Sequence, residues 1–211
     1  MTDIGEIKRD RSCNRRWLLR HGGPALPFIL AVIPASAAER VGSVEDVKGE
    51  AFAELDNARR TLDPAAPVFL GDEVATGIAS RLGMRLGRDT MVRLGEQARL
   101  KIDRFLVDAG GDMTLRSGPL LFDRPPGREP AAVIRSPFAL IAVRGTRFFA
   151  GPSNGRFSVF VARGSVAVIS AGQQVIVREG EGTDFVSPGT PPAPVNRWGS
   201  ERIRAALASV S

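Results

Sequence analysis

The sequence predicts an all-β protein in which many short strands form a twisted two-sheet sandwich or a β-solenoid-like domain, with a short helix at the C-terminus. Two observations lead to this prediction. Apolar and polar residues alternate with a period of two, which is typical of strands with one buried face. The 211 residues also include 23 glycines and 15 prolines spread along the chain. Turns that recur every 8–12 residues or so, with short strands between them, are typical of sandwiches and solenoids.

Residues 1–38 have the three parts of an export signal. A basic start that ends near Arg15 and Arg16 precedes an uncharged apolar stretch. Ala35 and Ala37 are the small residues that a signal peptidase reads, which puts cleavage near Ala37/Ala38. The arginine pair, followed one residue later by two leucines, resembles a twin-arginine (Tat) signal. We therefore expect a periplasmic protein without a stable membrane anchor, and a general secretory (Sec) signal or a retained leader are the alternatives.

Residues 39–187 contain the strand pattern of the predicted all-β domain. Its first strands are expected around Val41, Val44 and Val47 and at Ala51–Leu55. Alternating apolar positions then follow at Leu82, Met84 and Leu86, at Val92 and Leu94, at Leu100 and Ile102, at Met113 and Leu115, and in Leu120–Phe122. Ala109-Gly110-Gly111-Asp112 predicts a hairpin turn. Further strands are expected in the runs Ala132–Ser136, Leu140–Ala150, Phe157–Val161, Ser165–Ile169, Gln174–Val177 and Asp184–Val186.

The C-terminal tail differs in composition from the domain. Residues 188–198 are rich in proline and predict a stiff, extended linker. Residues 199–211 predict a short amphipathic helix with Ser200 as its N-cap. Ile203, Leu207 and Val210 fall on one face of this helix. We expect that face and Trp198 to dock on an open end or edge of the β domain.

The composition excludes several classes of function. The single cysteine, Cys13, and the single histidine, His21, both lie in the predicted leader. After cleavage the protein would have no disulfide, no Cys/His zinc site and no Ser-His-Asp triad, and we expect no cofactor. The net charge of +6 is divided between leader and domain without a long basic run, so nucleic acid is not expected as a partner.

Three motifs together resemble the periplasmic domain of the FecR family. The chain opens this pattern with Val41-Gly42-Ser43-Val44. It continues with Gly71-Asp72, Thr76-Gly77 and Ser80, and then with Arg144-Gly145-Thr146 and Gly164-Ser165-Val166. The resemblance covers about residues 41–180.

The motif residues also have structural interpretations of their own. Glycine supplies positive φ in turns, and the side chains of Asp72 and Thr76 can bond local backbone. Gly145, inside an apolar run, predicts a bulge or a close approach of two backbones. We expect Arg144 to pair with a carboxylate such as Asp72, and the Thr146 hydroxyl to make a local hydrogen bond. A structural role is therefore favoured for Gly71, Asp72, Thr76, Gly77, Arg144, Gly145, Thr146 and Gly164.

The leading functional hypothesis is a non-catalytic periplasmic module that binds another envelope protein or a cell-wall glycan. The better-known members of the family resemble a cytoplasmic anti-sigma segment, a membrane helix and a periplasmic sensor in series, and the short polar start of this chain departs from them. A membrane-anchored sigma-factor regulator stays an alternative if the leader is retained. A polysaccharide-active enzyme is the other alternative, with carboxylate pairs such as Asp103 with Asp108 or Asp123 with Glu129.

Overall fold

The computed structural model describes residues 38–106, 110–127 and 132–211. The export residues Arg15, Arg16, Ala35 and Ala37 lie outside these described residues, as do Asp108 and Glu129. Within the described ranges, no helix is long and apolar enough to cross a membrane.

Two nine-stranded sheets make up the domain. The first, sheet A, has the strand order β18-β17-β14-β13-β10-β7-β6-β1-β4. Its strands are β1 (Arg40–Lys48), β4 (Pro67–Phe69), β6 (Arg81–Leu86), β7 (Thr90–Leu94), β10 (Leu120–Asp123), β13 (Arg147–Ser153), β14 (Arg156–Arg163), β17 (Glu181–Phe185) and β18 (Asn196–Arg197).

The second sheet, sheet B, has the order β16-β15-β12-β11-β9-β8-β5-β2-β3. Its strands are β2 (Ala51–Leu55), β3 (Ala58–Thr61), β5 (Glu73–Thr76), β8 (Arg99–Leu106), β9 (Gly110–Ser117), β11 (Ala132–Arg135), β12 (Leu140–Val143), β15 (Ser165–Ser170) and β16 (Gln173–Arg178). Every strand pair is antiparallel except β9 with β11, because the chain visits sheet A through β10 between them.

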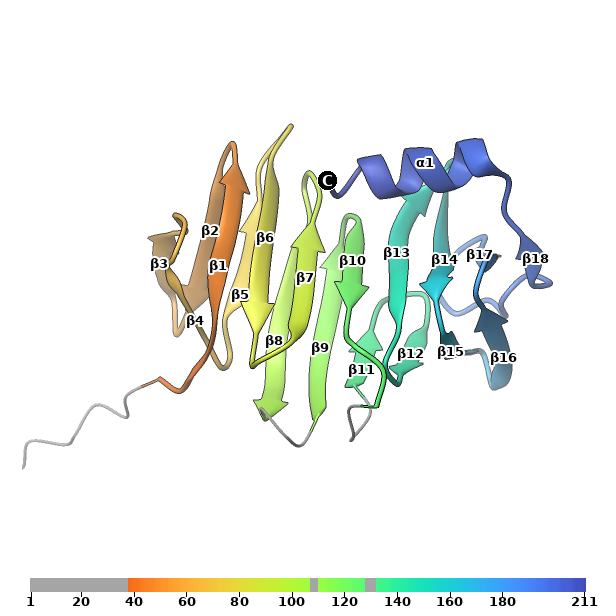
Figure 1. Ribbon diagram of the computed structural model, residues 1–211, viewed down its shortest axis with the longest axis horizontal. Helices are drawn as coiled ribbons and strands as arrows, with labels where there is room; N and C mark the ends of the chain where they lie inside the picture. Colours follow the sequence, from red (N-terminus) through yellow and green to blue (C-terminus); the bar gives the residue numbers. More distant parts are fainter. Residues whose placement is uncertain (1–37, 107–109, 128–131) are drawn as a thin grey trace, which may run out of the picture. The chain divides into compact units, whose positions relative to one another are not determined.

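The chain alternates between the sheets as it advances across them. Hairpin β6–β7 is in sheet A, β8–β9 in sheet B, β11–β12 in sheet B after the single strand β10, and β13–β14 in sheet A again. In Figure 1 the strands from β5 onward therefore advance in sequence order within each sheet, whereas β4 and β3 lie outside β1 and β2 at the first edge. This confirms the expected all-β, two-sheet fold with a short C-terminal helix, and the solenoid-like trait is this stacking of hairpins in chain order.

The main core lies between the two sheets and follows the predicted alternation. Leu82, Met84 and Leu86 are all buried, as are Leu100 and Ile102 on the opposite sheet. The three-residue spacings along β1 have a different cause, because its pairing is irregular on both sides of Val44: with β4 between Arg40 and Gly42, and with β6 between Val44 and Asp46. Burial of each such side chain is worth roughly 1.5–3 kcal/mol before ordering costs.

The run Leu140–Ala150, expected as one strand, is two strands in different sheets. β12 ends at Val143 in sheet B, and β13 begins at Arg147 in sheet A. Gly145 lies at the corner between them with a φ of +62°. The core-facing positions are Ile141 and Val143 before the corner but Phe148 and Ala150 after it, so the alternation shifts by one residue there. The run stays apolar because β13 is buried on both faces, which conceals the change of sheet in the sequence.

A second core lies on the outer face of sheet A, under helix α1 (Ser200–Ala208). It contains Leu121, Phe149 and Phe160 from the strands and Trp198, Ala206 and Val210 from the tail, with Ile203 and Leu207 partly buried against them. The helix runs across the strands in Figure 1. The tail thus docks as expected, but on a sheet face and not on an open end or edge.

Two details of the tail differ from expectation. The N-cap is Gly199, without a side-chain hydrogen bond, and Ser200 is the first helical residue. The proline-rich residues 188–198, expected as an extended linker, are bonded to the domain: Ala193 N–H donates to the Asp184 carbonyl (3.0 Å). Asn196–Arg197 then pair with β17 as β18. The segment is therefore the returning arm of a wide hairpin.

Candidate functional site

The motif residue Asp72 is fully buried and anchors the turn between β4 and β5. Its carboxylate accepts hydrogen bonds from Arg60 Nη1 (2.9 Å) and from Phe69 N–H (2.7 Å), and it forms an ion pair with Arg60 Nη2. Arg60 belongs to the neighbouring hairpin β2–β3. The guanidinium that meets Asp72 is thus that of Arg60, whereas the sequence had suggested Arg144.

Thr76 and Ser80 join turns that are far apart in the sequence. The Thr76 hydroxyl donates to the Gly95 carbonyl (2.5 Å) and accepts from Ala98 N–H (3.0 Å). Ser80 Oγ accepts from Glu50 N–H (2.9 Å). The neighbouring glycines also take part through their backbone, since Gly71 N–H donates to the Ile102 carbonyl and Gly77 N–H to that of Glu50. These contacts connect strands and offer no free chemical group.

The other motif residues gather at the corner between β12 and β13. A Cβ on Gly145 would lie 2.7 Å from the Cα of Pro126, and a Cβ on Gly164 would lie 2.8 Å from Cγ2 of Thr146. Both constraints foreseen for Gly145, an unusual backbone conformation and a close approach, are present. Arg144 is exposed beside them. This corner is separated from β5 in sheet B by β8, β9 and β11, so the motif residues do not form one site.

The carboxylate pairs suggested for a polysaccharide-active enzyme have only one member each among the described residues. Asp103 accepts a hydrogen bond from the Thr114 hydroxyl (2.5 Å) and pairs with Lys101. Asp123 pairs with Arg163 (2.8 Å) and Arg147 (3.8 Å). Both carboxylates are thus engaged with partners on the surface of a sheet. No group of three potential metal ligands occurs in the part of the chain that the structure describes.

An apolar cleft of about 430 Å³ is the strongest candidate for a binding site. Three turns that are distant in the sequence line it: β9–β10, β11–β12 and β13–β14. The lining residues are Leu115, Arg116, Ser117, Gly118, Pro137, Phe138, Pro152, Gly155, Arg156 and Phe157. The cleft therefore combines apolar walls with two arginines.

The aromatic wall of the cleft is held rigidly. Phe138 and Phe157 stack with ring centroids 4.5 Å apart and planes within 2°. Ser136 fixes the turn that carries Phe138, because its Oγ accepts from Ala139 N–H (3.0 Å) and from Phe138 N–H (3.3 Å). Phe185 packs against both rings from the core.

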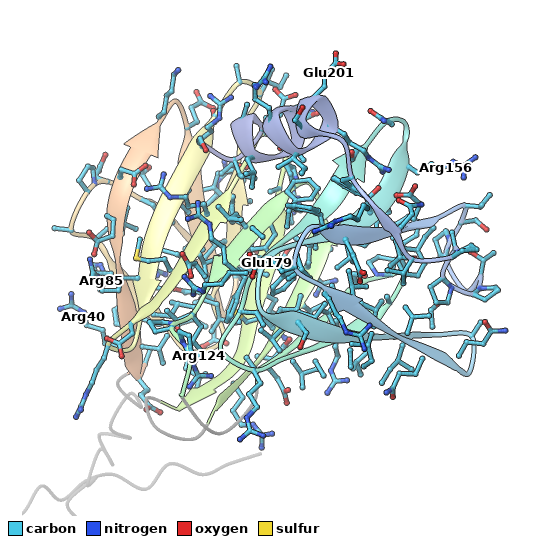
Figure 2. The ribbon with its side chains drawn as sticks, turned by 45° about the vertical axis from the view of Figure 1, so that its right-hand side comes forward. Arg40, Arg85, Arg124, Arg156, Glu179 and Glu201 are labelled. Atoms are coloured by element: carbon cyan, nitrogen blue, oxygen red, sulfur yellow. The ribbon has the colours of Figure 1, made fainter. Side chains whose placement is uncertain are left out.

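The two arginines of the cleft differ in their freedom. Arg116 Nε forms an ion pair with Glu73 (3.0 Å). Arg156 extends outward from the domain, away from the core (Figure 2). The sequence missed this cleft because its residues come from three separate turns, none of which carries a distinctive pattern.

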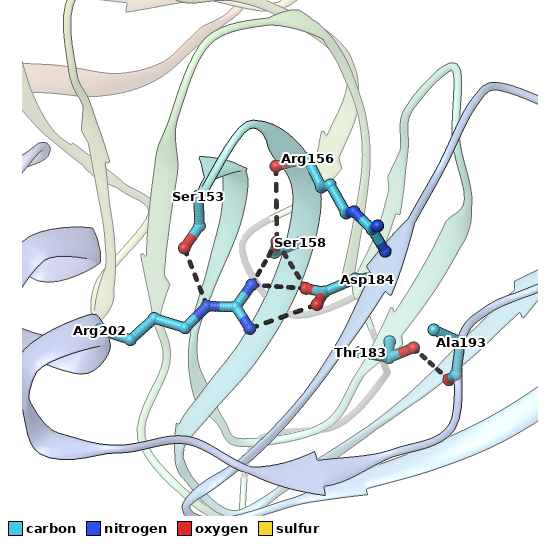
Figure 3. Close-up of polar contacts among 7 residues, drawn as sticks. All are labelled: Ser153, Arg156, Ser158, Thr183, Asp184, Ala193 and Arg202. Atoms are coloured by element: carbon cyan, nitrogen blue, oxygen red, sulfur yellow. Dashed lines mark hydrogen bonds and ion pairs between the residues drawn. The ribbon is translucent and has the colours of Figure 1, made fainter.

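A partly buried polar network next to the cleft fastens helix α1 to sheet A (Figure 3). Arg202 donates to Asp184 from both terminal nitrogens, Nη2 to Oδ1 at 2.6 Å and Nη1 to Oδ2 at 3.2 Å. It also donates to Ser153 and Ser158, and its guanidinium stacks on Trp198 at 3.7 Å from the ring centroid. The polar groups of Arg202, Asp184, Ser153 and Ser158 all have partners within the network, so its role is to hold the helix.

The pKa of Asp184 reflects this network. Burial raises the pKa of the carboxyl group, but hydrogen bonds from Arg202 and Ser158 and the charges of Arg202 and Arg156 lower it by more. The pKa therefore lies below its ordinary value of 3.8, and the carboxylate stays charged at neutral pH.

Comparisons with known proteins agree with the motifs. Residues 72–167 match the family described as FecR protein. The chain carries a FecR domain. The matched region begins at Asp72 and ends in β15, so it includes the apolar cleft and the corner at Gly145. No curated protein matches the sequence of the chain.

Solved structures share the fold of this FecR domain. Two crystal structures of a protein from Parabacteroides distasonis, described as a "putative anti-sigma factor", match with a TM-score of 0.53 and 16% identity. Each match covers 64% of this chain and 63% or 64% of the other. The chain thus spans just under two thirds of the length of these neighbours, and the likeness supports the fold.

Proposed function

We propose that this FecR domain is a non-catalytic binding module of the bacterial envelope that recognises another protein through the apolar cleft. The proposal includes export to the periplasm and removal of residues 1–38. One observation carries it: a cleft with stacked Phe138 and Phe157, two prolines and two arginines suits an apolar, acidic protein segment. Interfaces are enriched in aromatic residues and arginine in the same way.

The same lining favours a protein over a cell-wall glycan. Sugar rings are bound by aromatic faces together with many hydrogen-bonding side chains. Here Phe138 and Phe157 present their faces to each other, and Ser117 is the only hydroxyl in the lining. A sigma-regulating role would be one use of such a module.

Site-specific photo-crosslinking in the producing bacterium tests the proposal. We expect a photoreactive residue at position 156 to give a discrete protein adduct in the periplasmic fraction, and one at the exposed position 204 on α1 to give none. Pro137→Glu should abolish the adduct at position 156 while leaving the melting temperature unchanged, because Pro137 is exposed. Equal adducts at both positions, or binding of the domain to purified cell-wall sacculi in its place, would refute recognition of a protein by the cleft.

A further inference from the structure

The outer face of sheet B, on the opposite side of the domain core from α1, carries a patch of apolar side chains. On β11, β12, β15 and β16 the residues Ile134, Ile141, Val168 and Val177 point into the core and are buried. Because side chains alternate along a strand, their neighbours point outward. We call six of these neighbours the outer patch: Val133, Leu140, Ala142, Ala167, Ile169 and Ile176.

The strand register arranges the outer patch in two rows. Val133, Ala142, Ala167 and Ile176 are paired in succession across the four strands. Leu140 and Ile169 are paired in the next row, between Arg135 and Gln174. On the other half of the same face the paired residues are Glu73, Lys101 and Thr114, which interact with solvent and with surface charges. On β5, β8 and β9 this row is thus charged or polar, and the outward Phe52 on β2 is covered by the guanidinium of Arg59.

On sheet A a comparable row of outward apolar residues is covered by a helix. There, Leu121, Phe149 and Phe160 are paired across β10, β13 and β14, and α1 covers them by lying across the strands. Among the described residues α1 is the one helix, and it lies on that sheet. The outer patch belongs to neither buried cluster, and Ile176 is 41% exposed.

The shape of the outer patch suits a helix. Ala142 and Ala167 form a low floor between Val133 and Ile176, with Leu140 and Ile169 as a ridge along one side. Three strand spacings separate the ends of the row, about 14 Å, which is the length of about nine residues of a helix lying across the strands.

An arginine lies beside the floor. Arg178 is exposed in the adjacent position on β16, opposite Ser165. Asp112, at the β9 end of the row, is already paired with Arg104 and Arg135. A second copy of the chain would present the same arginine, whereas a segment with acidic residues would complement it. The patch also offers about 200 Å², far less than the roughly 800 Å² per partner of a stable dimer.

From these observations we propose that the outer patch binds an amphipathic helix of another protein, laid across β11, β12, β15 and β16, with acidic residues flanking its apolar stripe. This surface is separate from the apolar cleft, and the inference holds whether or not the cleft has a ligand.

The test uses synthetic peptides and the folded protein. The probe is a fluorescent helical peptide of about 15 residues with a leucine stripe flanked by glutamates. The comparison peptides have lysine flanks or a scrambled stripe. We expect the acidic peptide to bind and Ala167→Glu or Ile176→Glu to weaken its binding by about tenfold or more. Ile78→Glu is the matched control, because Ile78 is an exposed isoleucine elsewhere on the domain. Thermal melts establish that each variant is folded.

Charge exchange makes the test specific. Arg178→Glu should reverse the preference, so that the lysine-flanked peptide binds more tightly than the acidic one. Arg156→Glu, in the cleft, should leave the affinity for both peptides unchanged. The inference is overturned if the scrambled peptide binds equally, if no peptide binds, or if Ile78→Glu weakens binding as much as Ile176→Glu. A concentration-dependent dimer that Ile176→Glu dissociates would also overturn it, by showing that the patch joins two copies.

Discussion

Gly145 shows how a single residue position can determine the path of the chain between the sheets. Its φ of +62° lies in the left-handed region, and a Cβ there would meet the backbone of Pro126 at 2.7 Å. Neither constraint can be relieved by rotating a side chain. The sequence could locate this position, because a glycine inside an apolar run demands a reason, but it could not reveal that the reason is a change of sheet.

We expect Gly145→Val to destabilise the domain by about 2 kcal/mol or more, because a β-branched residue is strained at positive φ and would also collide with Pro126. Gly172→Val is the matched control. Gly172 has a φ of +74°, but nothing lies within 4 Å of its added Cβ, so it carries the backbone strain alone. Chemical denaturation of both variants measures the difference, and equal losses would show that the approach to Pro126 costs nothing.

Thr146 differs from the sequence expectation of a local hydrogen bond. It is 1% exposed, and its hydroxyl has no hydrogen-bond partner among the described residues. A buried unsatisfied hydroxyl costs about 1–3 kcal/mol. Thr146→Val keeps the shape of the side chain and removes this cost, so we expect its midpoint of denaturation to rise. Thr146→Ala also removes the methyl group that contacts Gly164, and should lower stability by about 1 kcal/mol. A lower midpoint for Thr146→Val would mean that the hydroxyl is satisfied in solution.

At the scale of elements, helix α1 depends on one polar network and one apolar cluster. The apolar runs Leu120–Phe122 and Val159–Val161 are continuous, and both faces of their strands are buried. Such runs are visible in the sequence, and they predict that another element covers the outer face of the sheet. The partners of Arg202 were not predictable in this way. Ser153, Ser158 and Asp184 belong to three strands whose spatial order the local pattern does not encode.

The Asp184 network should make the docking of α1 sensitive to acid. The pKa of Asp184 is lowered in the folded protein, so its contribution to stability is full above its ordinary value of 3.8 and is lost as the pH falls through the lower folded value. We expect the melting temperature of wild type to exceed that of Asp184→Asn at pH 7, and this difference to shrink below about pH 4. Asp63→Asn, at an exposed carboxylate in a turn, is the control. A difference that stays constant down to pH 2 or so would contradict this assignment.

The apolar face of α1 should contribute at least as much to the stability of the domain as the Asp184 network. Deleting residues 198–211 uncovers Leu121, Phe149 and Phe160, and we expect the melting temperature to fall by several degrees with increased aggregation. Ala206→Glu and Ala205→Glu form a milder, matched pair, since Ala206 is buried against the sheet and Ala205 is exposed. Only the first should lower the melting temperature. Equal effects of the two substitutions would mean that the helix is not held by this face.

For the whole molecule, local patterns predicted the strands better than their arrangement. Alternation at Leu82–Leu86 or Leu100–Ile102 identifies a strand and its buried face, but both sheets face the same core, so neither pattern says which sheet the strand joins. The alternation of hairpins between sheets arises from the corners and turns, such as those at Asp72 and Gly145. The apolar cleft depends on the same arrangement, since three separate turns form it. A sequence pattern that is local in range cannot predict a site assembled from distant turns.

Export is the prediction that concerns the protein as a whole, and it depends on residues 1–38. If Arg15 and Arg16 form a twin-arginine signal, changing both to lysine should leave an uncleaved precursor in the cytoplasm, because the Tat receptor reads the arginine pair itself. A Sec signal needs only positive charge and would tolerate the exchange. Arg9 and Arg11 changed to lysine provide the matched control with the same charge. Immunoblots of cytoplasmic, membrane and periplasmic fractions then separate the outcomes. Normal periplasmic accumulation of the Arg15→Lys, Arg16→Lys protein would refute the Tat route but not export, whereas wild-type protein of precursor size in the membrane fraction would mean that the leader is retained as an anchor.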